Sequence, residues 1–531
     1  GRPGVVSARK PGSIQVALDD WPEGRLQRID LCPDERTRLR QASAIARARL
    51  LDGAARSLRE RLLGLDEPRF VGQTPVDFAT TLNPPQEDAV RFALSARDYA
   101  IVHGPPGTGK TTTLAEIVFQ AVRGGAKVLA CAPSNTAVDN LLEKLVGLMP
   151  SGIRVGHPAR VFEALRGHTL DELVENDEAS AIVRDMHREA DRLLRSADKP
   201  SRSREAHRRR RELRAEAREL RQSAKMLERH TIQQVLSSAD VVCTTLTIDE
   251  ELLGDRRFDL VVIDEACQAT EPAIWQAVLR GERIIFAGDH CQLPPTVLSA
   301  EAKREGLGVS PMERLVSHGG ADVYRRLTVQ YRMNERLMRF SSERFYDGER
   351  VADAAVRSRR VTDLAGGNGA LTDTPTLEFW DTAGAGWDEE KEPDGESRRN
   401  PREATWVVNQ VRELLEAGLE PAQIGVIAPY AAQARLLRGR LQTPGLEVDT
   451  VAGFQGREKE ALRISSVRSN ADGEIGFLAD TRRTNVALTR ARSLLRAIGD
   501  SATLGGNEFY AAMLDDVQRH GEYHTVWELG E

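Results

Sequence analysis

A glycine-rich segment, GPPGTGKT at residues 104–111, holds the side chains best suited to chemistry in this chain. It follows an apolar run, Tyr99–His103, and precedes a helical pattern that begins near Thr112. A glycine-rich turn at the start of a helix directs several backbone N–H groups at one anion. Here Lys110 supplies a positive charge for the β- and γ-phosphates, and the Thr111 hydroxyl can ligate Mg²⁺. The segment predicts a nucleoside triphosphate site, although a tight strand-to-helix turn would also use these glycines.

Two later segments place polar side chains directly after apolar runs. VVIDEA at 261–266 ends in Asp264 and Glu265, and parallel sheets gather such strand ends at one edge. Asp264 can hold Mg²⁺ through water, and Glu265 can polarise the water that attacks the γ-phosphate. In GDHCQLPP at 288–295, Gln292 can contact the γ-phosphate or orient that water. The alternatives are an exposed acidic pair and a turn with an incidental glutamine.

The composition of the 531 residues restricts the class of protein. Hydrophobic and charged residues make up 40% and 29% of the chain, as in ordinary globular proteins, and three or four domains of about 150 residues are expected. The net charge of −6 excludes a globally basic nucleic-acid coat, so any such contact must come from a local groove. No apolar run reaches about 18 residues, so no membrane span is expected. Cysteines far apart, without CxxC or a Cys/His cluster, argue against zinc, iron–sulfur or disulfide frames and favour a reducing cytosol: Cys32, Cys131, Cys243, Cys267 and Cys291.

Short, nearly continuous apolar runs alternate with helical patterns in two sets. Runs of this kind fit strands that are buried on both faces of a parallel sheet. We therefore predict two α/β domains. The first set is Tyr99–His103, Lys127–Pro133, Asp240–Thr245, Phe258–Ile263 and Arg283–Ala287. The second set is Leu377–Asp381, Ile424–Ala428, Glu447–Val451, Leu462–Val467 and Leu494–Ile498.

The remaining segments predict a small β-module and two helical regions. Residues 12–18 and 25–31 favour short strands between turn residues, and residues 33–63 favour one long exposed helix. Between 160 and 235 the pattern is almost wholly helical, with a seven-residue leucine spacing that predicts a hairpin packed on itself. The arginines at 208–211 are expected on a solvated helix face or, alternatively, on a basic arm that touches phosphate backbone.

Ten segments together resemble the superfamily 1B helicases of the up-frameshift and immunoglobulin-mu-binding type, a branch that includes senataxin. They occur in the same order as in the family. One such segment could match by chance, whereas ten segments in the same order are a highly specific match. The segments are LNPPQEDAV (82–90), GPPGTGKTTT (104–113), APSNTAVDN (132–140), VVCTTL (241–246), VVIDEA (261–266), GDHCQLPP (288–295), QYRMN (330–334), IGVIAPYAAQ (424–433), VDTVAGFQGRE (449–458) and RRTNVALTRAR (482–492).

The resemblance implies an α/β fold of two RecA-like parallel-sheet domains, with a helical insertion in the first and a partial N-terminal β-barrel on a helical stalk. Because only part of a barrel is expected, we also expect the N-terminus to be truncated. The implied division is 1–31 for the partial barrel, 32–75 for the stalk, 76–159 and 236–321 for the first RecA-like ATPase domain, 160–235 for the insertion and 322–531 for the second RecA-like domain.

Carried over residue by residue, the resemblance implies one site for ATP and Mg²⁺. Gln86 matches the residue that reads the adenine edge, Tyr331 the aromatic residue packed on the base, and Gly456 and Glu458 the ribose- and phosphate-side contacts. The loop contributes Gly104, Pro105, Pro106, Gly107, Thr108, Gly109, Lys110, Thr111 and Thr112, with Mg²⁺ on Thr111 and Asp264. The implied catalytic residues are Lys110, Asp264, Glu265, Gln292, Arg332 and Arg490.

Arg332 and Arg490 match two arginines that reach the γ-phosphate from the family's second domain. A cation supplied across a cleft can stabilise the transition state by about 10³–10⁵ in rate. Closing and opening of that cleft would turn hydrolysis into motion of one domain against the other. Without the other motifs, the simplest interpretation of each arginine would be a partner in a surface salt bridge, which contributes little to stability.

The family also implies a surface that follows a single strand through hydroxyls and amides, which bind phosphate and sugar without reading sequence. Ser134 and Asn135 could instead simply start the following helix. With only 5% aromatic residues, a continuous stacking platform is not expected. The matching positions are Pro133, Ser134, Asn135, Thr244, Thr245, Tyr430, Thr450 and Asn485.

Three residues depart from the family pattern. Ala452 stands where the family usually has Asp, and Arg463 and Arg496 fall in expected core strands where the family has apolar residues. A buried unpaired arginine costs several kcal/mol. Either these arginines lie near anions, or the second domain is destabilised.

The resemblance implies an ATP-dependent helicase or translocase that moves on single-stranded DNA or RNA, in the 5′→3′ direction. Alternatives are an ATPase that translocates or strips proteins but unwinds poorly, a non-hydrolysing clamp on single strands, and a transport ATPase. DNA and RNA both stay open, because a groove that follows the backbone discriminates mainly through the 2′-OH. We expect a cytoplasmic monomer without membrane contact.

Overall fold

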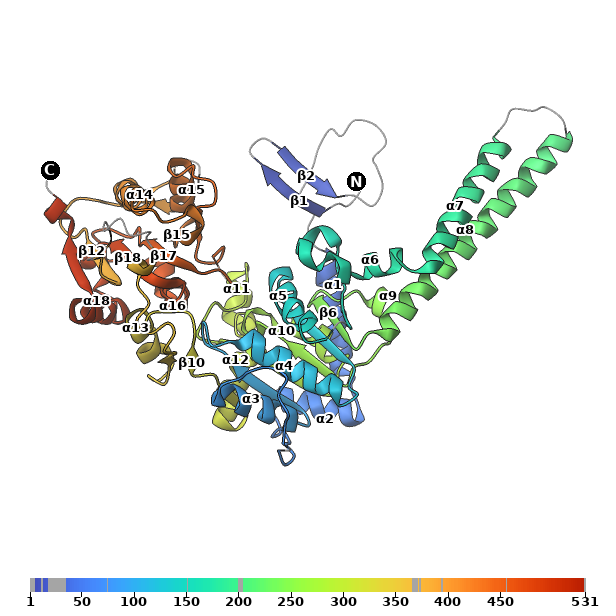
Figure 1. The fold of residues 1–531 in the computed structure, drawn as a ribbon, viewed down its shortest axis with the longest axis horizontal. Coiled ribbons are helices and arrows are strands. Elements are labelled where there is room, and N and C mark those ends of the chain that lie inside the picture. The colour runs from blue at the N-terminus through green and yellow to red at the C-terminus, as the bar shows by residue number, and fades with distance from the viewer. Residues whose placement is uncertain are drawn as a thin grey trace. The chain divides into compact units, whose positions relative to one another are not determined.

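The computed structural model describes residues 5–10, 13–17, 35–73, 75–149, 151–198, 204–364, 371, 374–392, 395–454 and 456–529 (Figure 1). Its contacts divide the chain into two compact units. The first contains residues 1–81, 90–100 and 111–286, and the second contains residues 82–89, 101–110 and 287–531. None of the described helices is long and apolar enough to cross a membrane.

A seven-stranded sheet, in the order β5-β6-β4-β7-β8-β3-β9, contains all five strands predicted for the first set, each within two residues. Pairs β5–β6, β6–β4, β4–β7, β7–β8 and β3–β9 are parallel. Strands β3, β4, β7 and β8 are buried at every position, as expected for the interior of such a sheet. The bounds are β3 Tyr99–His103, β4 Val128–Ala132, β5 Gly152–Arg154, β6 Val241–Thr245, β7 Leu260–Ile263, β8 Ile284–Gly288 and β9 Tyr324–Arg326.

The helices around these strands include two in the region predicted as one long helix. The prediction of a single helix over 33–63 is wrong. Helix α1 ends at Arg49 and α2 begins at Gly53, whose φ of +51° lies outside the α-helical range, so one continuous helix cannot pass through this position. The helices are α1 Glu35–Arg49, α2 Gly53–Leu62, α3 Pro84–Ser95, α4 Lys110–Arg123, α5 Asn135–Val146, α9 Glu250–Leu253, α10 Glu271–Val278, α11 Ala300–Ala302 and α12 Pro311–Gly319.

The predicted helical hairpin is confirmed. After α6 (Leu170–Glu175), the long helices α7 (Glu178–Ala197) and α8 (Arg204–Ser238) lie side by side (Figure 1). Buried alanines, rather than the leucines, occupy the centre of the seam, because small side chains let two helices approach closely; they are Ala190, Ala197, Ala217 and Ala224. Arg214 and Arg221 pair across the hairpin with Asp198 and Asp191, each at 2.8 Å.

A six-stranded parallel sheet in the second unit has the order β16-β15-β17-β18-β12-β19. The five predicted strands are confirmed within three residues. The strands are β12 Leu377–Asp381, β15 Ile424–Ala428, β16 Glu447–Thr450, β17 Lys459–Ser465, β18 Ala491–Gly499 and β19 Glu522–Thr525. Two-residue strands β10 Val329–Gln330, β11 Val351–Ala352, β13 Glu390–Lys391 and β14 Arg398–Arg399 lie outside this sheet.

Apolar clusters cover both faces of the six-stranded sheet. One cluster joins the sheet to α14 and α15, and the other joins it to α13, α16 and α18. The sheet is therefore a buried central layer, which explains why its strands read as continuous apolar runs. The helix bounds are α13 Glu335–Phe345, α14 Pro401–Glu416, α15 Ala431–Arg440, α16 Thr481–Leu488, α17 Ser501–Leu504 and α18 Glu508–His520.

At the N-terminus the structure describes one antiparallel pair, β1 (Val5–Lys10) with β2 (Ser13–Ala17). The strand predicted over 12–18 is thereby confirmed as β2. The strand predicted over 25–31 lies outside the described residues, as does most of the segment assigned to a partial barrel.

The two unusual arginines of the second sheet lie opposite each other in register, Arg463 on β17 and Arg496 on β18. Arg496 Nε donates to Glu378 Oε1 at 2.6 Å, and Gln410 and Glu413 accept from its Nη1. Arg463 is fully buried; Nη1 donates to the carbonyl of Leu462 at 3.3 Å, while Nε and Nη2 have no hydrogen-bond partner among the described residues. Burial, followed by the charge of Arg496, lowers the Arg463 pKa well below its usual value.

Replacing Arg463 with Met is expected to increase the free energy of unfolding by about 1–4 kcal/mol, because an apolar chain of similar length removes a buried, poorly compensated cation. Arg496→Met is the matched control on the neighbouring strand. It should instead destabilise by about 3–5 kcal/mol, since it leaves the buried Glu378 carboxylate unpaired. Urea denaturation followed by tryptophan fluorescence measures both, and the same sign for the two changes would contradict this account.

Candidate nucleotide and nucleic-acid sites

The predicted phosphate loop connects β3 to α4, which begins at Lys110. Gly107 and Gly109 have φ angles of +78° and +76°, in the left-handed region that favours glycine. A Cβ at Gly107 would lie 2.6 Å from Arg332 Cβ, and a Cβ at Gly109 would lie 2.5 Å from Gln86 Nε2. Both glycines are therefore required by backbone conformation and by close neighbours, as expected of a loop that wraps an anion.

Predicted adenine-side residues lie against this loop. Gln86 is buried; its Nε2 donates to Thr108 O at 3.0 Å, and its Oε1 accepts from Asn83 N at 3.0 Å. Asn83 Nδ2 donates to Tyr331 Oη at 2.8 Å, and Tyr331 N donates to Gly107 O at 2.8 Å. The Tyr331 ring stays 42% exposed and is therefore available to stack on a base. Gln86 and Tyr331, 245 positions apart in the sequence, thus belong to one hydrogen-bonded group that includes the loop.

The acidic pair follows β7 directly. Asp264 is buried and its Oδ1 accepts from Glu265 N at 2.8 Å. Glu265 has a φ of +52°, which is uncommon for a residue other than glycine and typical of constrained functional positions. Gln268 Nε2 donates to Glu265 Oε2 at 2.6 Å and fixes the direction of that carboxylate.

Gln292 belongs to a buried polar network after β8. Its Nε2 donates to Asp289 Oδ2 at 2.8 Å, and Asp289 also accepts from Tyr346 Oη at 2.6 Å and lies 2.9 Å from His103 Nε2. Burial would raise the pKa of Asp289, but these hydrogen bonds and the charge of His103 outweigh burial and lower that pKa. Asp289 is therefore a fixed carboxylate that orients Gln292.

The two predicted arginines contact residues of the same unit. Arg490 is 3% exposed, and its Nη2 donates to Gln292 Oε1 at 3.3 Å. Arg332 donates from Nη1 to Thr489 O at 3.1 Å and pairs through Nη2 with Glu458 at 3.0 Å. Arg490 and Gln292, two residues predicted to act on the γ-phosphate, therefore lie in direct contact.

Glu458, predicted on the ribose and phosphate side, lies between two arginines. It pairs with Arg332 at 3.0 Å and with Arg492 at 2.8 Å. Burial raises the Glu458 pKa, but the charge of Arg332 and the hydrogen bond from Arg492 more than offset burial, so the pKa lies below its usual value. Gly456 is exposed, with a φ of +76°.

Most predicted strand-binding residues lie at carboxyl ends of neighbouring strands. Ala132 of β4 pairs with Thr245 of β6, so Pro133–Asn135 directly follow that edge. In the second sheet Ala428 of β15 pairs with Thr450 of β16. Their exposure differs: Ser134 is exposed, Pro133, Asn135, Thr245 and Thr450 are half-buried, and Thr244 and Tyr430 are buried.

Local roles account for some of these residues. Ser134 caps α5 by accepting from Ala137 N at 3.2 Å, the alternative that the sequence left open. Asn485 is fully buried. Its Oδ1 accepts from Ser341 Oγ at 2.6 Å, and its Nδ2 donates to Cys291 O and Tyr346 Oη at 2.8 and 3.0 Å. In this conformation Asn485 offers no surface to a strand and holds the loop that carries Gln292.

A turn that sequence reasoning missed follows β17. Val467 has a φ of +71°, which is strained for a β-branched residue, and its N–H donates to Glu403 Oε2 at 2.9 Å. Burial raises the pKa of Glu403 to about 8. Arg468 donates to Tyr430 Oη at 3.3 Å. The signal was available in the sequence, because Arg468, Ser469 and Asn470 directly follow the predicted strand 462–467, as the acidic pair of VVIDEA follows its strand.

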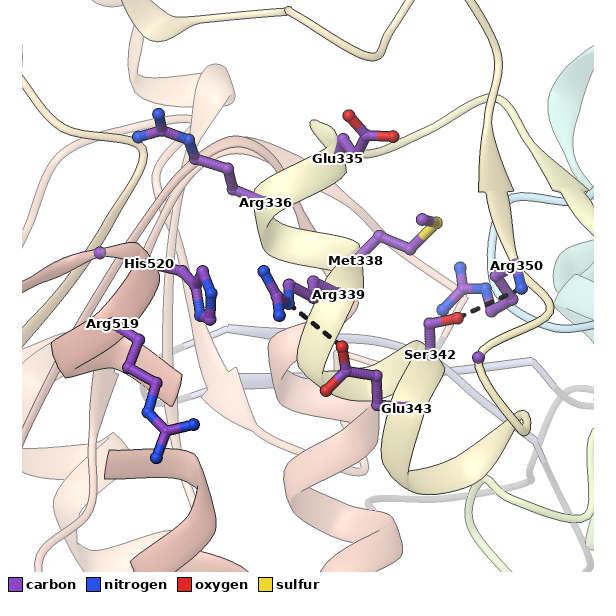
Figure 2. A pocket seen from close by; sticks show the side chains of 11 residues that line it. Glu335, Arg336, Met338, Arg339, Ser342, Glu343, Arg350, Arg519 and His520 are labelled. Carbon is purple, nitrogen blue, oxygen red and sulfur yellow. Dashed lines mark hydrogen bonds and ion pairs between the residues drawn. The ribbon is translucent and has the colours of Figure 1, made fainter. Parts of the chain in front are cut away.

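A separate surface pocket of about 610 Å³ lies between α13 and the end of α18 and contains none of the predicted site residues. Figure 2 shows Arg339 pairing with Glu343, and Ser342 bonding to the backbone of Arg350. Arg350 is buried, and its Nη2 donates to Pro106 O at 2.8 Å. Arg350 thus links this pocket to the phosphate loop, and two of the exposed lining arginines, Arg339 and Arg519, pair with Glu343 and Asp515.

Known proteins agree with the motifs. Family models described as AAA domain match residues 81–300 and 307–502. The DNA-binding protein SMUBP-2 of Rattus norvegicus is 40% identical over 99% of this chain and 53% of its own length, so the chain spans about half of that relative.

Two further relatives are covered over two thirds of their length or more. The DNA polymerase alpha-associated DNA helicase A of Schizosaccharomyces pombe is 39% identical over 83% of this chain and 67% of its own. An uncharacterized ATP-dependent helicase of Methanocaldococcus jannaschii is 33% identical over 96% of this chain and 82% of its own. The chain belongs to the Upf1-like superfamily 1 helicase family.

Proposed function

We propose that this chain is an ATP-dependent nucleic-acid helicase or translocase that moves on single-stranded DNA or RNA, in the 5′→3′ direction that the family implies. Lys110 and Gln292 would contact the γ-phosphate, Glu265 would polarise the attacking water, and Arg332 and Arg490 would neutralise charge in the transition state. Two RecA-like domains, over 76–159 with 236–321 and over 322–531, would alternate between closed and open arrangements during the cycle. The monomeric state and cytoplasmic location stay predictions.

The observation that carries this proposal is the contact of Arg490 Nη2 with Gln292 Oε1 at 3.3 Å. A glutamine and an arginine side by side are groups that can orient water and stabilise the charge of the transition state in nucleotide hydrolysis. The neighbouring contacts of Gln86, Tyr331 and the loop supply a matching place for the base. A non-hydrolysing clamp would need neither arrangement.

The residues present suit ATP and Mg²⁺. The left-handed glycines of the loop expose backbone N–H groups, and a hydroxyl with a carboxylate is an oxygen set that Mg²⁺ accepts. Thr111 and Asp264 would hold the ion, which would neutralise charge on the β- and γ-phosphate oxygens. Asp264 is already buried and oriented by the N–H of Glu265.

ATP turnover measured against rising concentrations of single-stranded DNA and of RNA of equal length tests the proposal. We expect stimulation of at least tenfold by one or both, falling with salt because the strand is held largely through phosphate contacts. Tailed duplexes with either overhang then separate unwinding from translocation and give the direction. ATP turnover that neither strand stimulates would contradict a helicase or translocase and favour another class of ATPase.

A further inference from the structure

Four potential metal ligands, His103, Asp289, His290 and Cys291, meet where β3 and β8 end. Each offers one ligand atom, and the four atoms lie within 4.8 Å of one another. The sequence places Asp289, His290 and Cys291 side by side, but the fourth ligand, His103, lies 186 positions away from Asp289. The two segments meet because β3 and β8 are neighbours in the sheet, with Gly104 N donating to Gly288 O at 3.0 Å.

Among the described residues, two ring nitrogens of the cluster take part in no hydrogen bond. Within the described residues, Nδ1 of His103 and Nδ1 of His290 have no hydrogen-bond partner, although His103 is fully buried. Buried polar atoms are nearly always paired, so each exception calls for an occupant or a role. The rings of His103 and His290 lie 4.5 Å apart between centroids, close enough to face one ion.

Surrounding residues already orient the ligands, as they do around established metal centres. Tyr346 Oη and Gln292 Nε2 both donate to Asp289 Oδ2, at 2.6 and 2.8 Å. Cys291 Sγ donates to Phe345 O at 3.2 Å, and Asn485 Nδ2 donates to the carbonyl of Cys291. His290 and Cys291 are partly exposed, so an ion has a route in from solvent.

We propose that His103, Asp289, His290 and Cys291 bind one borderline-soft divalent cation, with Zn²⁺ the best match, apart from any Mg²⁺ that accompanies nucleotide. Two imidazoles, a thiolate and a carboxylate are ligands that Zn²⁺ accepts in tetrahedral sites, whereas hard cations such as Mg²⁺ prefer all-oxygen sets. In a tetrahedral complex, Zn–ligand bonds of about 2.0–2.3 Å place the ligand atoms roughly 3.3–3.8 Å apart. Binding would therefore require the most distant of the four ligand atoms to move about 1 Å closer to one another.

Such an ion would join the end of β3 to the loop after β8. Gly104 of the phosphate loop directly follows His103, and Gln292 directly follows Cys291. The ion would replace the thiol hydrogen bond of Cys291 and release the thiol proton to solvent, and any imidazolium proton of His103 or His290 would leave with it, because only neutral imidazoles bind metal. Its effect would be to fix the relative positions of the phosphate loop and Gln292, whatever reaction the chain catalyses.

Titration of chelator-treated, reduced protein with Co²⁺ tests the site by absorption spectroscopy. We expect one equivalent to give the visible bands of a tetrahedral complex with a thiolate-to-cobalt charge-transfer band, and Zn²⁺ to bleach them stoichiometrically. Cys291→Ala should abolish the charge-transfer band. His290→Ala should weaken Zn²⁺ affinity by more than the about 10–100-fold that outer-shell changes cost.

Cys131→Ala, which removes a buried thiol outside the cluster, is the matched control and should leave the cobalt spectrum unchanged. Thermal unfolding of the metal-free variants shows whether each is folded, and either ligand variant alone suffices for the comparison. Wild-type protein that gives no thiolate-to-cobalt band, or a band that persists in Cys291→Ala, would overturn the proposal. Neither result bears on ATP hydrolysis, which the strand-stimulated assay tests separately.

Discussion

Glu265→Gln is expected to lower ATP turnover by about 10²–10⁴-fold, the contribution of a positioned general base. The substitution keeps the size of the side chain and the backbone N–H that donates to Asp264 Oδ1 at 2.8 Å. The left-handed φ of +52° suits glutamine no worse than glutamate. Only the basic carboxylate is lost, so the affinity for a single strand should stay within twofold. Steady-state ATPase assays at saturating strand and fluorescence polarisation of a labelled strand measure the two quantities.

Glu251→Gln is the control, because it removes an exposed carboxylate just after the cap of α9 and should leave turnover unchanged. Near-wild-type turnover in Glu265→Gln would show that another group activates the water. Equal losses of turnover and strand affinity would instead indicate a folding defect in the turn after β7.

The central strands could be predicted from the sequence because burial on both faces leaves an uninterrupted apolar run. Two of the edge strands give no such signal: β9 reads Tyr-Arg-Arg and β19 reads Glu-Tyr-His-Thr, and neither is fully buried. The break between α1 and α2 was also missed, since a single Asp-Gly pair, Asp52–Gly53, costs little against the helical pattern on either side. Local sequence patterns therefore predicted the buried strands of both sheets, but not every edge strand or helix boundary.

Contiguous motifs single out candidate residues, but they do not say what each side chain touches. Asn485 matches a strand-binding position, yet tertiary packing buries it among Ser341, Cys291 and Tyr346. Arg496 pairs with Glu378 because its strand, β18, lies next to β12 in the sheet. This strand order cannot be read from the spacing of motifs in the sequence. Contacts of this kind depend on topology, which is why the motif pattern could not distinguish a binding residue from a supporting one.

Arg490→Ala is expected to reduce kcat for ATP hydrolysis by about 10³–10⁵-fold, the range for an arginine that stabilises phosphoryl-transfer charge. Arg490 is 3% exposed, and apart from its contact with Gln292 its Nη1 donates to Arg457 O at 3.5 Å. Because the charge on the γ-phosphate oxygens spreads only in the transition state, the loss should fall on kcat, with ATP affinity changed by less than tenfold. Single-turnover hydrolysis and binding of a fluorescent ATP analogue separate the two quantities.

Arg490→Lys distinguishes the charge from the shape of the side chain. Lysine keeps a positive charge but lacks the planar fork that holds Gln292, so an intermediate rate is expected. The control is Arg483→Ala, within α16 and seven positions before Arg490, which pairs with Asp480 and should retain full turnover. If Arg490→Ala loses ATP affinity as strongly as kcat, Arg490 binds the ground state and is not the group that stabilises the transition state. If Arg483→Ala is equally impaired, the effect belongs to the stability of α16, because no charge has then been removed from beside Gln292.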